Sequence, residues 1–179
     1  MLCLLLPAIA TASEQSPTPP AAAPTATQAI QHMIAGVEKT ITGVATEMPD
    51  DKYGFAPTAG AFRGVRNFAA QIKHAAAVQY LVAASILGDP ITADMSDERG
   101  PDSVKTKAEV LKYLADSFAY LRKAAATVDD KNAFTPIKGV FGSAPDTRIG
   151  LIVGAVSHTS NYYGQVVEYL RLNGLVPPQ

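Results

Sequence analysis

The sequence predicts an all-α protein, a four-helix bundle with a long loop between its third and fourth helices. Apolar residues recur at steps of three and four along four long segments, which is the period of an amphipathic helix. Alanine supplies much of the 47% hydrophobic content, and this favours close helix packing. No segment alternates with the period of two that marks a half-buried strand. We therefore expect no β-sheet.

The N-terminal part is predicted to lie outside the folded domain. Residues 1–12 form a short apolar block ending in Ala-Thr-Ala, which fits a signal-peptide cleavage site. Residues 13–24 are rich in Pro, Ala, Ser and Thr, as in a flexible linker. The bundle domain is then expected over residues 25–179. The signal-like segment predicts a periplasmic or secreted protein, with a cytoplasmic protein as the alternative, and Cys3, the only cysteine, would leave with it.

The first two predicted helices each have a cap and an apolar face. The first is capped by Thr25 or Thr27 and runs from about Thr25 to Glu47. Its face consists of Ile30, Met33, Ile34, Val37, Ile41, Val44 and Met48. The second helix is capped by Asn67 and runs to about Leu87, where a Gly-Asp-Pro sequence stops it.

The last two helices flank the long loop. The third helix begins at a capping box in which Thr106 is the cap and Glu109 reaches back. Its inward face is expected to be Val110, Leu114, Phe118, Leu121 and Ala125. The loop at 132–142 is predicted to pack its aromatic residues onto the bundle. The fourth helix is expected to begin at Ser143, with a proline and an aspartate in its first turn, and to run to about Asn173.

Composition limits the classes of partner. The chain has 15 Lys and Arg against 16 Asp and Glu, and no basic cluster, so we expect no nucleic-acid partner. No apolar run approaches the roughly 18 residues that a membrane span requires, so we expect no membrane span.

Two of the three histidines are candidates for a buried site. His32 lies beside the first apolar face and is expected at the surface, whereas His74 lies in the middle of the second helix and is expected to be at least half buried. His158 shares a stripe with Tyr162, one turn later. That stripe is Leu151, Ala155, His158, Tyr162, Val166 and Tyr169. If the second and fourth helices are neighbours, both imidazoles enter the interior at similar depth, as in bundle metal sites.

A metal site would need a third ligand, and Tyr162 is the geometric candidate. A phenol is a poor ligand unless the metal lowers its pKa strongly. The alternative is that His158 and Tyr162 hydrogen-bond to each other or to water in the core. No Asp or Glu lies one turn from a candidate ligand on the same face, so we assign no catalytic residue.

Several stretches resemble the DinB-like (DinB/YfiT) superfamily. In the first half they are KYGFAPT at 52–58, RNF at 66–68 and QIKH at 71–74. In the second half they are HTSNYYGQVV at 158–167 and YLRLNGLVPP at 169–178. The resemblance covers nearly the whole predicted domain.

This resemblance implies a four-helix bundle, often dimeric, with a divalent metal such as Zn²⁺ or Ni²⁺ held by three histidines. His74 matches the first ligand position and His158 the second. Tyr162 occupies the third position, where the family has histidine, and Asn161 stands where an acidic residue is frequent. Two imidazoles and a phenol are expected to bind the metal more weakly than three imidazoles. Family members with assigned activities are metal-dependent hydrolases and thiol transferases.

Several functional hypotheses follow. The first is an exported metal-dependent hydrolase or thiol transferase that acts on a small-molecule substrate. The second is a metal-poor, non-catalytic bundle in which His158 and Tyr162 line a small pocket or fill the core. The third is an interaction module whose helices pair across a homodimer axis. A purely structural helical protein is the remaining alternative.

Overall fold

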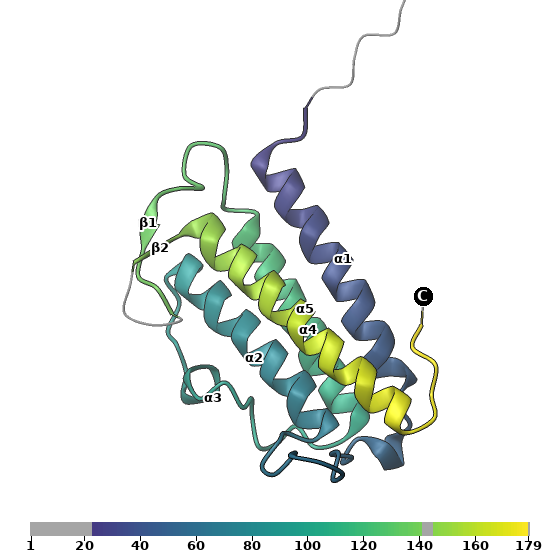
Figure 1. Ribbon diagram of the computed structural model, residues 1–179. Coiled ribbons are helices and arrows are strands. Elements are labelled where there is room, and N and C mark those ends of the chain that lie inside the picture. Colours follow the sequence, from purple (N-terminus) through teal and green to yellow (C-terminus); the bar gives the residue numbers. More distant parts are fainter. Residues whose placement is uncertain (1–22, 141–144, 179) are drawn as a thin grey trace, which may run out of the picture.

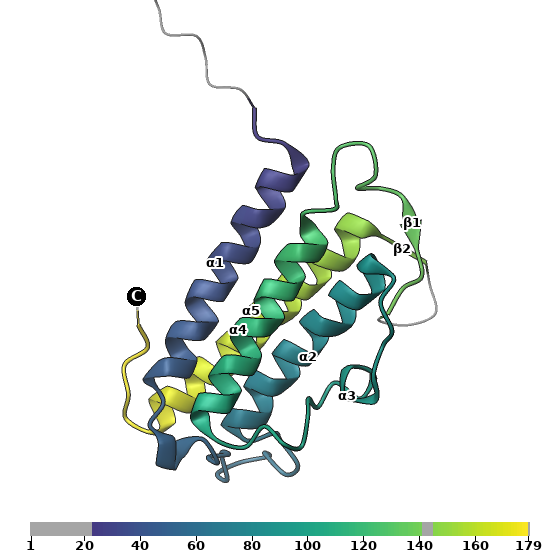
Figure 2. The ribbon, with the colours of Figure 1, turned by 180° about the vertical axis from the view of Figure 1, so that it is seen from behind.

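Four long helices lie side by side and form the bundle that the sequence predicts (Figures 1 and 2). The computed structural model describes residues 23–140 and 145–178. The long helices are α1 Ala26–Glu47, α2 Phe68–Leu87, α4 Lys107–Ala125 and α5 Arg148–Leu172. Helix α5 packs against both α1 and α2, so the second and fourth long helices are neighbours. The predicted signal peptide and residues 13–22 of the predicted linker lie outside the described residues.

The two ends of the bundle differ in what they carry. Helix α1 begins at one end, and the connection at 53–67 lies at the opposite end, near the last turns of α5 (Figure 1). Helix α1 has 22 residues and is therefore about 33 Å long. The start of the domain and the 53–67 connection are thus separated by about the length of the bundle.

Three helices begin where the sequence predicts. The Thr25 side chain accepts from the backbone N–H three residues on, and Asn67 Oδ1 does the same for Ala70 at 2.9 Å. In α4 the Thr106 side chain accepts from the Glu109 N–H, and the Glu109 carboxylate accepts from the Thr106 N–H at 2.8 Å. These side chains satisfy backbone donors that the first turn of a helix leaves unpaired.

The last helix begins later than predicted. Thr147 is its cap, and its hydroxyl accepts from the Gly150 N–H at 3.0 Å. The predicted start at Ser143 lies outside the described residues, but Asp146 is in extended backbone and not in the first helical turn. Both Ser143 and Thr147 are good cap residues, and strand pairing of Asp146–Thr147 holds the backbone extended up to Thr147.

That pairing also corrects the expectation of no sheet. Strands β1 Pro136–Ile137 and β2 Asp146–Thr147 form an antiparallel pair, with Pro136 opposite Thr147. Two residues are too few to show an alternating pattern, so sequence periodicity could not reveal them. The other short elements are the 3₁₀ helix η1 Asp50–Lys52 and the single helical turn α3 Ala93–Ser96.

The core follows the predicted apolar faces, with two exceptions. The whole predicted inward face of α4 is buried. On α1 only Met33, at the edge of the stripe, is exposed, at 37%. In the loop after α4, Phe134 is 76% exposed, so the prediction that it packs on the bundle is wrong. Ala133 turns inward instead, and its neighbour therefore points outward; Phe141 lies outside the described residues.

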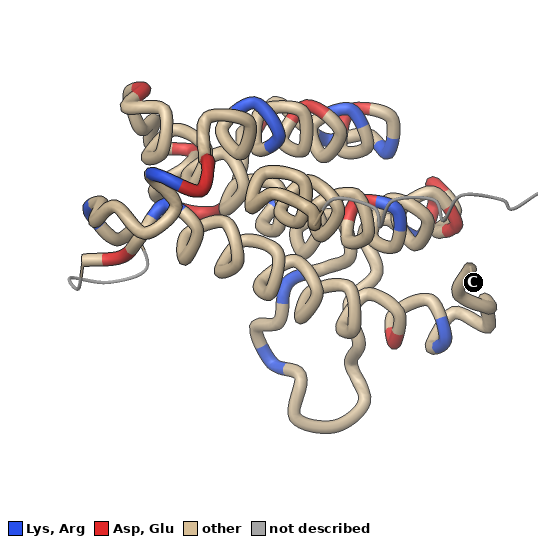
Figure 3. Tube along the Cα trace, turned by 90° about the horizontal axis from the view of Figure 1, so that it is seen from above, with Lys and Arg blue, Asp and Glu red and all other residues tan. Residues whose placement is uncertain are grey.

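Charged residues are unevenly distributed among the helices, and both signs are interspersed (Figure 3). Helix α4 carries six: Lys107, Glu109, Lys112, Asp116, Arg122 and Lys123. Helix α5 has none between Arg148 and Glu168, and α2 has only Lys73. The interface between α2 and α5 is therefore poor in carboxylates. Within residues 23–140 and 145–178, no helix combines the length and apolar character needed to span a membrane.

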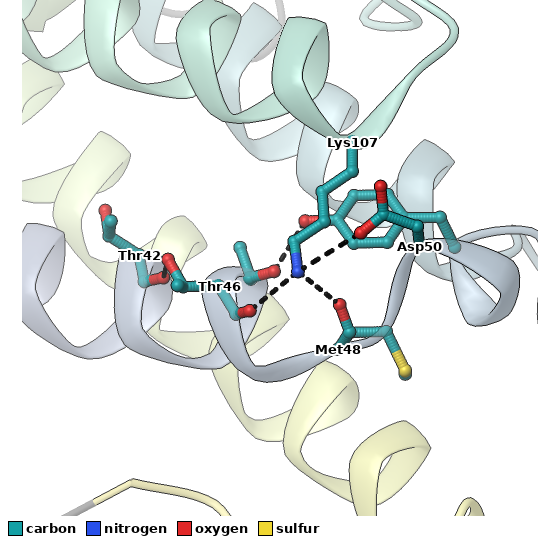
Figure 4. Close-up of polar contacts among 7 residues, drawn as sticks. Thr42, Thr46, Met48, Asp50 and Lys107 are labelled. Atoms are coloured by element: carbon teal, nitrogen blue, oxygen red, sulfur yellow. Dashed lines mark hydrogen bonds and ion pairs between the residues drawn. The ribbon is translucent and has the colours of Figure 1, made fainter.

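Lys107 connects α4 to the end of α1 (Figure 4). Its Nζ donates to the carbonyl oxygens of Thr46 at 2.9 Å and Met48 at 2.8 Å, and lies 3.6 Å from the Asp50 carboxylate. The last carbonyl groups of a helix have no partner within it, and the helix dipole favours a cation there. The lysine therefore caps α1 from a neighbouring helix.

Candidate functional site

Two histidine rings meet between α2 and α5. His74, in the second turn of α2, is only 3% exposed, and His158, near the middle of α5, is half-buried. Their Nε2 atoms are 3.1 Å apart, with ring centroids 4.9 Å apart. His32 is exposed on α1, as predicted. The structure thus brings together the two histidines that the sequence singles out.

A buried polar network links three of the long helices. Gln79 Nε2 donates to Thr159 Oγ1 at 3.2 Å, and Ser117 Oγ donates to Gln79 Oε1 at 2.9 Å. All three side chains are fully buried. Thr159 follows His158 in sequence, so the network joins α2, α4 and α5 next to the imidazole pair.

The second ring nitrogen of His74, Nδ1, has a defined hydrogen-bond partner. His74 Nδ1 lies 2.7 Å from the backbone carbonyl oxygen of Glu98. A carbonyl only accepts, so Nδ1 carries the proton and Nε2 presents its lone pair to His158. The Glu98 backbone has a φ of 54°, in the left-handed region that non-glycine residues rarely adopt. Its carboxylate also approaches, with Oε2 3.7 Å from Nδ1.

The second ring nitrogen of His158, Nδ1, is buried without a hydrogen-bond partner among the described residues. Two proton arrangements fit the 3.1 Å contact with His74. In one, His158 Nε2–H donates to His74 Nε2, and the unpaired Nδ1 is a bare acceptor. In the other, both Nε2 lone pairs face a shared cation, and Nδ1 carries the proton.

Both imidazoles are neutral at pH 7. Burial is the main cause that lowers the pKa of His158 to about 4, with further contributions from His74 and the Arg66 guanidinium. Burial also lowers the pKa of His74 below its ordinary 6.5, although the hydrogen bond to Glu98 opposes this. A neutral imidazole is the form that coordinates a metal ion.

Tyr162 completes the cluster with its ring. The ring centroid lies 4.6 Å from that of His74 and 4.7 Å from that of His158. Its hydroxyl oxygen accepts from Arg66 Nη1 in a long contact of 3.4 Å. The phenol therefore packs against both imidazoles while its oxygen lies near a guanidinium group.

A polar cleft of about 450 Å³ adjoins the cluster. It is lined by Gly64, Val65, Arg66, Gln71, Tyr162 and Gln165. These residues come from the 53–67 connection, the first turn of α2 and the middle of α5. Tyr162 belongs to both the histidine cluster and the cleft wall, so the two form one continuous region.

The chain matches a model of a known family. A model of the DinB superfamily matches residues 33–166, about three quarters of the chain, including both histidines and Tyr162. The chain belongs to the DinB superfamily. A search of curated proteins finds no match.

A solved structure shares the DinB fold. It is a crystal structure of a DinB-like protein from Bacillus cereus ATCC 10987, with a TM-score of 0.64 and 14% sequence identity. The match covers 84% of this chain and 94% of that chain. At this identity the likeness shows the fold alone.

The spacing of the His74 and His158 nitrogens fits a divalent metal. Two nitrogens bound at 2.0–2.1 Å with a tetrahedral angle lie about 3.3 Å apart, close to the 3.1 Å between His74 Nε2 and His158 Nε2. In the described part of the chain, no three His, Cys, Asp or Glu side chains converge. Two nitrogen ligands therefore fit, and Tyr162 occupies the third position of the family pattern.

The sequence did not predict three residues that lie at the site formed by His74, His158 and Tyr162. Arg66 and Gln71 appeared in the resemblance, but neither was expected beside the histidines. Glu98 could not be predicted from the sequence, because it contacts His74 through its backbone carbonyl, which every residue type has. Its left-handed φ was not predictable either, because a glutamate rarely adopts that backbone conformation. The proximity of all three depends on the path of the connections between the helices.

Proposed function

We propose that this DinB-superfamily protein binds a divalent metal ion such as Zn²⁺ or Ni²⁺ between α2 and α5, and acts as a metal-dependent hydrolase or thiol transferase. The observation that carries the proposal is the 3.1 Å approach of His74 Nε2 and His158 Nε2, with the His74 tautomer set by the Glu98 carbonyl. A ligating histidine commonly donates its other ring nitrogen to such a carbonyl.

Each side chain has a distinct role in this proposal. His74 and His158 provide two nitrogen ligands, and Tyr162 provides an oxygen at the third position. The metal, when bound, would supply a Lewis acid that activates water or a thiol. The Glu98 carbonyl orients the His74 ring, and the Tyr162 ring covers both imidazoles. No carboxylate is assigned as a base, since Glu98 approaches His74 from its Nδ1 side.

Metal content tests the proposal. After dialysis against Zn²⁺ or Ni²⁺ and removal of free ion, the protein should retain about one equivalent. His158→Ala should lose most of it, because only one nitrogen ligand remains. His32→Ala is the matched control, since His32 is exposed on another helix and should have no effect. Retention below about a tenth of an equivalent in the unaltered protein would contradict the proposal.

A second function is favoured by Tyr162, whose oxygen lies near the cationic Arg66. In this reading the bundle is metal-poor and non-catalytic, and it binds a partner or ligand without a metal. Tyr162→His would then restore a third imidazole and create tight Zn²⁺ binding where the unaltered protein has little. The measurement is a Zn²⁺ titration by calorimetry. Failure of Tyr162→His to gain affinity would show that the histidines are not arranged for a metal.

We also propose that the protein forms a homodimer, as the family resemblance implies. Light scattering coupled to size exclusion gives the molar mass directly. A mass of a single chain across the concentrations tested would contradict this proposal.

A further inference from the structure

The cleft beside the histidines contains a cation that lacks a carboxylate partner within the described part of the chain. Arg66 is exposed, and no Asp or Glu among residues 23–140 and 145–178 lies within ion-pair distance of it. Its guanidinium makes one long hydrogen bond, to the Tyr162 hydroxyl at 3.4 Å. Most of its donors remain available to a ligand.

The same cleft contains a buried acceptor without a partner. Gln71 is 4% exposed, and its Oε1 has no hydrogen bond among the described residues. Its Nε2 lies 3.1 Å from Gln165 Oε1 and 3.4 Å from the Tyr169 hydroxyl. That hydroxyl donates its only proton to the Arg66 carbonyl at 2.9 Å, so it can only accept from Gln71. This fixes the amide orientation and leaves Oε1 free.

We propose that this cleft binds a small organic carboxylate that also carries an N–H donor, such as an N-acyl amino acid. The carboxylate would pair with the Arg66 guanidinium, whose planar fork matches it. Gln71 Oε1 is covered in this structure, so a small shift of the side chains around it on binding would let the ligand N–H donate to it and satisfy the buried acceptor, which otherwise costs free energy. A cleft of about 450 Å³ has room for a molecule of this size.

A carboxylate fits this cleft better than a phosphate does. Among residues 23–140 and 145–178, Arg66 is the only cationic residue that lines it. Phosphate carries more negative charge near pH 7 than a carboxylate and is best held by several cationic groups, whereas a carboxylate matches a single guanidinium.

The role of this molecule as a substrate rests on the metal site proposed above, whereas its binding does not. A ligand held by Arg66 and Gln71 would lie against Tyr162, on the wall shared with the histidine cluster. The binding experiment is therefore performed on the full chain with excess EDTA. Loss of metal binding and loss of carboxylate binding are then separate results.

The test uses N-acetylglycine and calorimetry, with two analogues that each remove one group. 4-Oxopentanoate replaces the N–H by a methylene and keeps the carboxylate, and N-acetylglycinamide removes the carboxylate charge. We expect N-acetylglycine to bind, 4-oxopentanoate to bind at least about fivefold more weakly, and N-acetylglycinamide at least about tenfold more weakly. Inorganic phosphate should bind more weakly than N-acetylglycine.

Matched arginine variants test the protein side. Arg66→Gln should weaken N-acetylglycine binding at least about tenfold, and Arg66→Lys should lie between it and the unaltered protein. Arg63→Gln, an exposed arginine of the same connection that does not line the cleft, should change binding less than about twofold. Arg66→Gln keeps the backbone carbonyl that accepts from Tyr169, so the thermal midpoint should be unchanged.

Three results would overturn the inference. These are no detectable binding of N-acetylglycine, equal binding by Arg66→Gln and the unaltered protein, or tighter binding of phosphate. Carboxylate binding in a protein that retains no metal would support this inference and contradict only the metal proposal. Metal retention without carboxylate binding would support the metal proposal and contradict this inference.

Discussion

His74 and His158 contact each other through their Nε2 atoms, but their Nδ1 atoms are in different environments. His74 Nδ1 donates to the Glu98 carbonyl, whereas His158 Nδ1 is buried without a partner in the described part of the chain. A buried polar atom without a hydrogen bond typically costs about 1–3 kcal/mol. Such a cost at one ring of a pair is common where function, and not stability alone, determines the residue.

The burial of His158 predicts a pH dependence of stability in metal-free protein. The folded-state pKa of about 4 lies below the 6.5 of an ordinary histidine, so between these values the unfolded chain binds more protons. The free energy of unfolding should therefore fall as the pH is lowered through this window. His158→Gln cannot take up the proton and should show a shallower fall.

The measurement is the urea midpoint at about pH 7 and about pH 5 for both proteins, in EDTA. Carboxylates also titrate at low pH, but they are the same in both proteins and cancel in the difference. Equal falls in the two proteins would mean that His158 takes up its proton in the folded state at an ordinary pH.

At the scale of single residues, the sequence predicted the histidine pair because both residues lie on apolar helical stripes. It could not predict Arg66, because an exposed arginine in a connection has no periodic pattern. It could not predict the free Gln71 acceptor either. That acceptor depends on a hydrogen bond between Tyr169 and a backbone carbonyl 103 residues away in sequence.

Whole helices are aligned by the buried network around Gln79. This side chain bonds Thr159 on α5 and Ser117 on α4, so it relates three helices at the depth of the histidines. The Thr159 hydroxyl also donates to the Ala155 carbonyl of its own helix, and the single Ser117 proton is shared between Gln79 Oε1 and the Leu114 carbonyl. Removal of Gln79 would therefore leave neither hydroxyl without a hydrogen bond.

Two substitutions of Gln79 should consequently differ. Gln79→Ala leaves a cavity and should lower the free energy of unfolding by about 2–3 kcal/mol. Gln79→Leu fills most of the space, and since both hydroxyls keep their backbone acceptors, it should cost less than about 1.5 kcal/mol. Chemical denaturation of both variants gives the comparison. A larger loss for Gln79→Leu than for Gln79→Ala would show that the polar bonds outweigh the packing.

The helices themselves were predictable because caps and periodicity agreed. Thr25, Asn67 and Thr106 each combine a capping side chain with the start of an apolar stripe. The start of α5 was mispredicted because two cap residues lie four positions apart, and the choice between them depends on pairing with Pro136–Ile137. The residues around a helix start do not show whether another segment pairs with them, so this choice could not be predicted from the sequence.

At the scale of the whole molecule, Lys107 holds the first and third long helices together at one end of the bundle. Its side chain is 19% exposed, so water competes little for the ammonium group. The Lys112–Asp116 pair on the same helix differs, since both of its side chains are at least half exposed. Exposed pairs of this kind contribute little to stability.

Lys107→Met should therefore destabilise the protein more than Lys112→Met. Loss of two hydrogen bonds from a cation to helix carbonyls should cost about 1.5–3 kcal/mol. Lys112→Met removes only an exposed ion pair and should cost less than about 0.5 kcal/mol. Thermal and urea unfolding of both variants provide the measurement. Similar losses would indicate that the carbonyls at the end of α1 are satisfied equally well by water.

The direction in which α1 runs has a practical consequence for experiments on this protein. Its first residue and the Arg66 connection are at opposite ends of the bundle (Figure 1). A domain captured on a sensor chip through an affinity tag placed directly before Thr25 would be held by the end of the bundle opposite the 53–67 connection. Immobilisation at that residue therefore leaves the cleft open to the flowing buffer.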